Sequence, residues 1–194
     1  RCNFTNACRL EEIIENMPTN GHFLFSALNV FNNQDLRDFF LYLGVPSKIE
    51  RGGRVFPESD RAEDILKALI KFIKDNDVKI VYNNKVDRIL VDGGKVSGVI
   101  TNDGKTCYAD KVIVATGGAS YPGTGSTGEG FKLVEDLGHK IVPLKPGLVP
   151  IIIKEKWVQE LQGLSLKNVE IKAWVENKNV ASLFGEMIFT HFGI

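Results

Sequence analysis

With 194 residues and a hydrophobic content of 43%, the chain is long enough to bury a core, which excludes a disordered or collagen-like protein. The 24 Lys and Arg residues balance the 24 Asp and Glu residues, so charge gives no reason to expect a nucleic acid or an anionic membrane surface as a partner. No apolar run approaches the roughly 20 residues that span a bilayer, and no signal peptide opens the chain, which predicts a cytoplasmic protein.

The cysteines and the chain ends add two expectations. The chain has an odd number of cysteines, and they lack CxxC spacing: Cys2, Cys8 and Cys107. This pattern fits a reducing compartment and argues against a disulfide framework. The chain starts at Arg1 without an initiator Met and stops in the apolar stretch His191 to Ile194. We therefore expect an internal piece of a longer protein.

The first half of the chain carries two helical patterns. Apolar residues at three- and four-residue spacing predict a helix over Asn33 to Leu43, with Asn33 as N-cap and Gly44 as its stop. A longer apolar face predicts a second helix over Asp60 to Asp75, in which Asp60 and Glu63 form a capping box.

From Val78 the apolar period changes to about two. This predicts short strands at Val78 to Tyr82, Val86 to Val91 and Val96 to Thr101, joined as a β-meander by Gly-containing turns. Val112 to Ala115 is continuously apolar, which is typical of a strand buried on both faces of a parallel sheet. Glu129 to Leu137 then reads as a short helix with Thr127 as N-cap and Gly138 after its end.

The composition changes again near Pro150. Strands are predicted at Val149 to Ile153, Val169 to Val175 and Val180 to Phe184, and their alternation indicates an antiparallel unit. The sequence therefore predicts an α/β to α+β fold, with one domain over residues 1–149 and the start of a β-rich domain over residues 150–194.

The glycine-rich segment from Gly117 to Gly130 is the strongest candidate for chemistry. It contains six glycines between the predicted buried strand and a helix, where backbone N–H groups and the helix dipole can meet an anion such as a pyrophosphate. Gly123-x-Gly125-x-x-Gly128 matches the dinucleotide fingerprint, but it lies past the strand end and lacks the acidic residue about 20 positions further on. A loop whose glycines serve only turns and close packing is the alternative.

Four motifs occur in an order that is more specific than any single glycine pattern. They are Arg1-Cys2-Asn3-Phe4-Thr5-Asn6, Gly53-Arg54-Val55-Phe56-Pro57, Ala115-Thr116-Gly117-Gly118-x-Ser120-Tyr121-Pro122-x-Thr124-Gly125-Ser126-Thr127-Gly128, and Gly185-Glu186-Met187-Ile188-Phe189-Thr190-His191-Phe192-Gly193-Ile194. With these motifs the chain resembles the BaiN-like or YhiN-like bacterial flavoproteins, also described as aminoacetone-oxidase-family FAD-binding proteins. The likeness covers essentially the whole chain.

The resemblance implies a two-dinucleotide-binding-fold flavoprotein with an inserted antiparallel β-rich domain. It also implies an oxidoreductase that uses FAD, with NAD(P)H as an expected electron donor and a small molecule as substrate. In this family a glycine fingerprint that binds the FAD pyrophosphate precedes the segment equivalent to Arg1. The FAD contacts that the resemblance implies are Arg1, Cys2, Asn3, Thr5, Val86, Ala115, Thr116, Gly117, Gly118, Tyr121, Ser126, Thr127 and Gly128.

Several single residues have two interpretations each. Cys2 beside Arg1 is either a reactive thiol or a packed one. His191 is either an acid–base group or a hydrogen-bonded core histidine. Arg51 and Arg54 either hold an anion or are solvated. The three histidines lie far apart in the sequence, so no metal site is predicted, and the catalytic residues are not identifiable.

A second function class competes with the enzyme hypothesis. The chain by itself could be a cofactor-free structural fragment that self-associates through exposed strand edges. Visible flavin absorbance of the purified chain distinguishes the two hypotheses.

Overall fold

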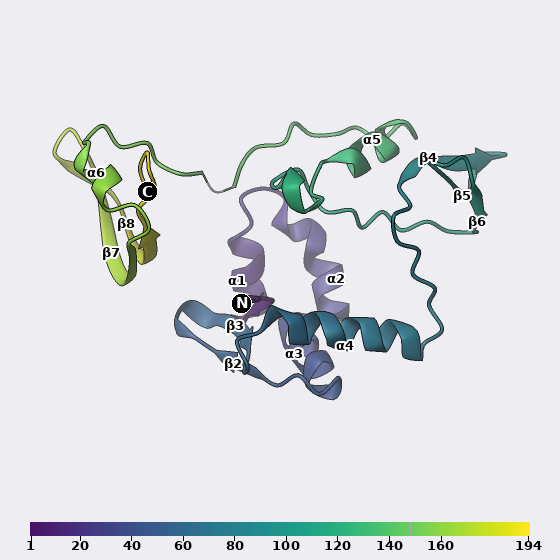
Figure 1. Cartoon of the computed structure of the whole chain (residues 1–194), viewed down its shortest axis with the longest axis horizontal. Helices are drawn as coiled ribbons and strands as arrows, with labels where there is room; N and C mark the ends of the chain where they lie inside the picture. Colours follow the sequence, from purple (N-terminus) through teal and green to yellow (C-terminus); the bar gives the residue numbers. More distant parts are fainter. Residues whose placement is uncertain (148) are drawn as a thin grey trace. The chain divides into compact units, whose positions relative to one another are not determined.

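The structure is a computed structural model that describes residues 1–147 and 149–194, and Leu148 lies outside the described residues (Figure 1). The chain forms two compact units, Arg1–Asn84 and Lys85–Ile194. Helices and antiparallel sheets occur together, which confirms the predicted mixed fold class. The predicted domain boundary near Pro150 stays a prediction.

The first unit combines short helices with a small sheet. Its sheet has three antiparallel strands in the order β1-β3-β2, so the middle strand is the last in sequence. The sequence patterns missed this sheet because its strands are too short to show a period. The elements of the unit are β1 Thr5–Asn6, α1 Leu10–Glu15, η1 Gly21–Leu24, α2 Phe25–Val30, α3 Asn33–Tyr42, β2 Ser47–Ile49, η2 Arg51–Gly53, β3 Arg54–Pro57 and α4 Ala62–Asp75.

The core of the first unit lies between α3 and α4. Phe40, Val45, Ile65 and Ala68 are buried together, and Phe4 meets Phe40 edge-on with ring centroids 5.0 Å apart. Burial of such side chains contributes about 1.5–3 kcal/mol each. The chain segment before β1 is therefore tied to the same core as the two helices.

Both helices predicted for this unit are confirmed, but their caps differ from the prediction. The N-cap of α3 is Asn32, whose side chain accepts from Gln34 N and Asp35 N while Asp35 accepts from Asn32 N. The helix α4 starts at Ala62, and Asp60 forms no cap. Asp60 has a left-handed backbone (φ 58°), and its carboxylate pairs with Lys48 and Arg1 instead.

The second unit begins with the β-meander. Its strands are β4 Val86–Asp92, β5 Lys95–Thr101 and β6 Thr106–Tyr108, in the order β4-β5-β6. The predicted strand Val78–Tyr82 is wrong, since this segment is extended but pairs with no strand. A turn in which Gly104 N donates to Thr101 O (2.8 Å) connects β5 to β6. Strand β6 then pairs with β5 on the edge opposite β4.

Two further predicted strands do not form. Val112–Ala115 adopts no strand, and Ile113 is 91% exposed. A strand of this kind requires neighbouring strands and covering helices, and no described residue pairs with it. Val149–Ile153 forms no named strand, although Ile152 makes an isolated bridge with Gly193 and Ile151 exchanges backbone hydrogen bonds with Ile194 (2.7 and 3.0 Å).

The remaining elements of this unit agree more closely with the patterns. Helix α5 (Glu129–Glu135) is capped by Gly128 in the left-handed conformation instead of by Thr127, and Gly138 follows its end with φ 89°. After α6 (Trp157–Glu160), β7 (Ser165–Val175) and β8 (Lys178–Ile188) form the predicted antiparallel pair. The hairpin turns at Glu176 and Asn177, which both have positive φ.

The turn between β5 and β6 gives a prediction about acid stability. Hydrogen bonds from Lys105 and from Thr101 lower the pKa of Asp103 from 3.8 to about 2. A carboxyl group with a lowered pKa stabilises the fold above its ordinary value, and this contribution is lost as the pH falls from 3.8 toward 2. We expect Asp103→Asn to remove that pH-dependent part of the unfolding free energy, measured by urea unfolding of both proteins across this range. An NMR titration midpoint near 3.8 for Asp103 would contradict the assignment.

Candidate functional site

The structure brings two of the four sequence motifs into direct contact. Strand β1 pairs with β3, so that Thr5 lies opposite Val55. Phe4 N donates to Val55 O (3.1 Å), and Val55 N donates to Asn3 Oδ1 (3.2 Å). The motif around Arg1 and the motif around Val55 thus form one structural element although about fifty residues separate them.

Arg1 is surrounded by charge of the opposite sign. Its guanidinium lies over the Phe56 ring, 4.0 Å from the centroid, and contacts Asp60 at 2.8 Å as well as Glu50. Lys48 Nζ lies 2.6 Å from the same Asp60, and this hydrogen bond is the main reason that the pKa of Asp60 is lowered. Two cations therefore face two carboxylates, and an anionic ligand at Arg1 would compete with both of them.

Cys2 and Thr5 are half-buried in the same region. Cys2 packs against the core cluster of Phe40 and its neighbours, and its thiol is free. This packing supports the interpretation of Cys2 as a packed thiol. Asn3 is exposed, and its Oδ1 accepts from Val55 N while no bond of its Nδ2 is described.

The glycine-rich loop of the second unit is folded by its own hydrogen bonds. Tyr121 and Ser126 form an isolated bridge around the short helix η3 (Pro122–Thr124), and Gly128 N donates to Gly118 O at 3.1 Å. Gly117 (φ 76°) and Gly128 (φ 80°) have left-handed backbones that other residues adopt only with strain. Gly118 has no such requirement.

Close packing explains other glycines of this loop. A Cβ atom on Gly130 would lie 1.9 Å from Thr116 Oγ1, and a Cβ on Gly128 would lie 3.1 Å from Ala119 Cβ. Thr116 and the first turn of α5 are therefore in direct contact. By contrast, a Cβ on Gly118 would meet nothing within 4 Å, so this glycine borders open space.

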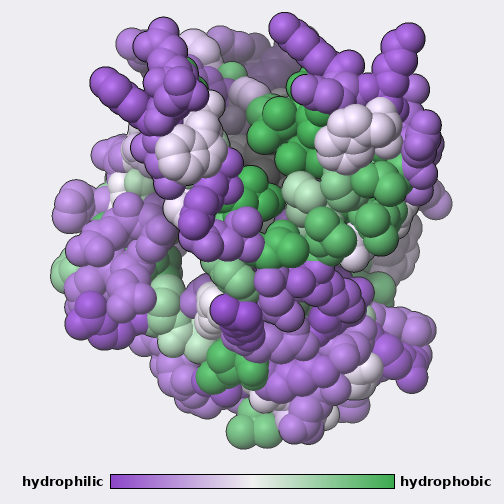
Figure 2. Space-filling view, turned by 90° about the vertical axis from the view of Figure 1, so that its left-hand side faces the viewer, coloured by the Kyte–Doolittle hydropathy of each residue, from purple (hydrophilic) through white to green (hydrophobic). Residues whose placement is uncertain are grey.

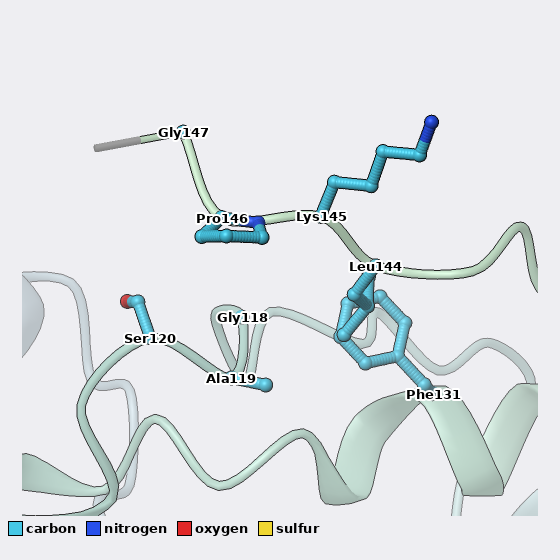
Figure 3. Close-up of a pocket in the computed structure, with 8 residues that line it drawn as sticks. All are labelled: Gly118, Ala119, Ser120, Phe131, Leu144, Lys145, Pro146 and Gly147. Carbon is cyan, nitrogen blue, oxygen red and sulfur yellow. The ribbon is translucent and has the colours of Figure 1, made fainter. Parts of the chain in front are cut away.

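The open space beside Gly118 is a slot of about 620 Å³ (Figure 3). Gly118 and Ala119 form one wall, and Pro146 and Gly147 lie opposite them. The Lys145 side chain points away from Gly118 (Figure 3). The sequence motifs did not identify the second wall, because Pro146 and Gly147 lie outside all four motifs. The slot is lined by Gly118, Ala119, Ser120, Phe131, Leu144, Lys145, Pro146 and Gly147.

Val86, the predicted contact in β4, borders a second cavity of about 370 Å³. The cavity lies between β4 and α5 and is lined by Lys85, Val86, Asp87, Arg88, Glu129, Lys132, Leu133 and Asp136. The structure therefore brings Val86 close to the helix that follows the glycine-rich loop.

The charge at the start of α5 is already balanced. Glu129 is its first residue, and a hydrogen bond from Lys85 lowers the pKa of its carboxyl group. A carboxylate at this position satisfies the positive end of the helix dipole. The helix has seven residues, so this end of α5 offers little to a pyrophosphate.

The predicted contacts fall into two groups. Arg1, Cys2, Asn3 and Thr5 lie in the first unit, and the other predicted contacts lie in the second. His191 is exposed and meets Phe192 edge-on at 4.6 Å, which corrects its interpretation as a core histidine. Arg54 Nε donates to Arg51 O (3.2 Å), so the interpretation of these two arginines as merely solvated is incomplete.

No helix in the described part of the chain, residues 1–147 and 149–194, is long and apolar enough to cross a membrane. Nor does this part contain a group of three or more His, Cys, Asp or Glu residues that could hold a metal ion.

Comparison with known proteins identifies the family of this chain. Residues 1–191 match the model of the HI0933-like protein Rossmann domain, and the chain belongs to this family. This confirms the resemblance to the BaiN-like or YhiN-like proteins that the four motifs predicted.

Three relatives align with the whole chain. It is 30% identical over 197 residues to a 3-dehydro-bile acid delta(4,6)-reductase of Clostridium scindens and covers 46% of that protein. It is 29% identical over 194 residues to a ribosomal RNA dihydrouridine synthase of Escherichia coli and 31% identical over 198 residues to that of Haemophilus influenzae, and it covers 47% of each. The chain thus spans about half the length of these relatives.

The contact between Gly130 and Thr116 gives a stability prediction. We expect Gly130→Ala to destabilise the chain by about 1–3 kcal/mol, because the added methyl group must displace Thr116. Gly118→Ala is the matched control, since its methyl group enters open space. Urea unfolding of both variants measures the difference. Equal stability of the two variants would show that the loop does not pack on α5 as described.

Proposed function

We propose that this chain carries part of the FAD site of an oxidoreductase that transfers a hydride or an electron pair to or from a small-molecule substrate, with NAD(P)H as donor. The observation that carries the proposal is the slot beside Gly118. Gly118 belongs to the third motif, and the chain belongs to a family with a Rossmann domain. One relative is named a reductase, which supports redox chemistry. Bound FAD would supply that chemistry, and the residues of the chain would bind and orient it.

The slot fits a flat, uncharged part of such a cofactor. Its volume of about 620 Å³ is in the range of small-molecule sites, and the bare Gly118 backbone lets a ring or sugar approach closely. Phe131, Leu144 and Pro146 provide apolar surface for stacking. The paired Glu129 disfavours a pyrophosphate at α5, so we assign the neutral portion of FAD to this slot.

The remaining predicted contacts support the same proposal in different ways. Asn3 offers an exposed amide, and Thr116, Tyr121, Ser126 and Thr127 offer hydroxyl groups around the loop. Arg1 would act through the position of its segment, because its charge is compensated by Glu50 and Asp60.

The balanced charge of the chain favours a small molecule over RNA, because nucleic-acid binding surfaces are strongly basic. The cytoplasmic location also stays a prediction.

The slot leads to a test with a single substitution. We expect Gly118→Val to weaken FAD binding at least about tenfold, because the branched side chain fills the space that the cofactor needs. Stability should change little, since the site has an ordinary φ and no neighbour within 4 Å. Flavin fluorescence titration and thermal unfolding measure the two effects separately. Unchanged affinity in a folded variant would remove the slot from the proposal.

The chain alone should bind FAD weakly. Within the described residues no glycine fingerprint joins a strand directly to a helix, so the charge-assisted bonds to the pyrophosphate, about 1.5–3 kcal/mol each, are missing. We expect a dissociation constant above about 1 μM, measured by flavin fluorescence with sedimentation establishing the oligomeric state. A submicromolar constant for a monomer would mean that the loop binds the cofactor unaided.

Self-association is the second candidate for the chain by itself. A groove of about 590 Å³ borders the β7–β8 hairpin, and Ile171, Leu183 and Phe184 beside it are at least one-third exposed. Figure 2 shows, on one face, apolar side chains gathered among polar ones. A two-stranded sheet with such a face is marginal in water, which favours contact with another polypeptide.

A further inference from the structure

Asn33, the first residue of α3, directs its side chain away from its own helix. Its Nδ2 donates to Asn6 O (2.6 Å) and to Cys8 O (2.9 Å), so both amide hydrogens are used. The helix does not need this side chain, because Asn32 provides the cap. Asn33 therefore links α3 to backbone carbonyls that precede it by 25 and 27 residues.

Asn6 holds the same segment from its other side. Its Nδ2 donates to Gly52 O (2.8 Å), and its Oδ1 accepts from Cys8 N (2.9 Å). A Cβ atom on Gly53 would lie 2.3 Å from Asn6 Oδ1, so only a glycine allows this approach. The Asn6 amide thus fits between two backbone segments without spare room.

These contacts matter because β1 itself is short. It has two residues, and the strand pairing is extended by the bonds from Phe4 N to Val55 O (3.1 Å), from Ala7 N to Gly53 O (2.7 Å) and from Val55 N to Asn3 Oδ1 (3.2 Å). Such a short ladder specifies its register weakly. The bonds from Asn33 and Asn6 supply the missing constraint.

We propose that Asn33 is a positioning residue that, together with Asn6, fixes the segment from Arg1 to Thr5 and so orients the groups that this segment presents to the cofactor. Orientation of the segment toward the cofactor rests on the proposed function. Fixation of the segment follows from the hydrogen bonds of Asn33 and Asn6 alone.

Asn33→Asp separates positioning from helix stability. The substitution keeps the shape of the side chain but replaces the two donor hydrogens by an oxygen that faces the carbonyls of Asn6 and Cys8. At the same time, a negative charge in the first turn favours α3 through the helix dipole. Gln34→Glu is the matched control, because it adds the same charge in the same turn, where the Gln34 side chain donates to Asp38 and accepts from Arg37 of its own helix.

The readout is amide hydrogen exchange in the whole chain followed by NMR. We expect Asn33→Asp to accelerate exchange at Phe4 and Ala7 about tenfold or more, the effect of losing two hydrogen bonds. Exchange at Leu43, whose amide donates to Phe39 O inside α3, should stay unchanged. Gln34→Glu should change neither position. Unchanged exchange at Phe4 and Ala7 in Asn33→Asp would overturn the proposal.

A second variant and a second measurement complete the test. Asn33→Ala removes the donors without adding charge and suits a helix, so it replaces Asn33→Asp if that variant does not fold. FAD added to the wild-type chain should shift the amide signals of Cys2 to Thr5, and these shifts should shrink in the Asn33 variants. Absence of shifts in the wild type would refute the proposed function for this segment, while the exchange data still decide whether Asn33 fixes it.

Discussion

Close approach of backbone and side chains at glycine residues is the constraint on which the candidate residues of each unit depend. In the first unit, Gly53 leaves room for the Asn6 amide, and in the second unit Gly130 leaves room for Thr116. Each contact joins segments that are separated in sequence, and each would be blocked by a single methyl group. Gly53 and Gly130 thus serve packing first, whereas Gly118 borders open space.

Charge compensation limits what the site can bind. Arg1 and Lys48 face Glu50 and Asp60, and Lys85 faces Glu129. These pairs are exposed or partly exposed, so they add little stability, but they reduce the local positive charge that an anionic group would need. An arrangement of this kind suits the neutral parts of a cofactor better than its phosphates. The glycine-rich segment Gly117 to Gly130, with its match to the dinucleotide fingerprint, is therefore not by itself a phosphate site.

The sequence predicted the elements whose stability is local. The helices α3 and α4 and the β7–β8 hairpin follow from apolar periodicity within the segment itself. The β1–β3 pairing was not predictable, because its two-residue strand depends on partners about fifty residues away. Conversely, the apolar run Val112–Ala115 predicted a strand, but a run of this kind forms one only when other strands lie beside it.

The caps and the site show the same limit of local patterns. Asp60 fits a capping box by spacing, yet its carboxylate has stronger partners in Lys48 and Arg1. The motifs identified the glycine wall of the slot, whereas the opposite wall at Pro146 and Gly147 became visible only in the fold. Sequence reasoning located the chemistry to a loop, and packing then determined which glycine of that loop is accessible.

The relatives bear on where substrate specificity lies. Proteins whose names refer to a bile acid and to ribosomal RNA match the whole chain at 30%, 29% and 31% identity. A region that related proteins with such different named activities share to the same degree is expected to serve what they have in common. Discrimination between a flat apolar molecule and a polyanion requires opposite surface chemistry, basic for the polyanion. The balanced charge of this chain and its paired cations do not provide the basic surface that a polyanion requires, which agrees with the proposed role of the chain in holding a cofactor.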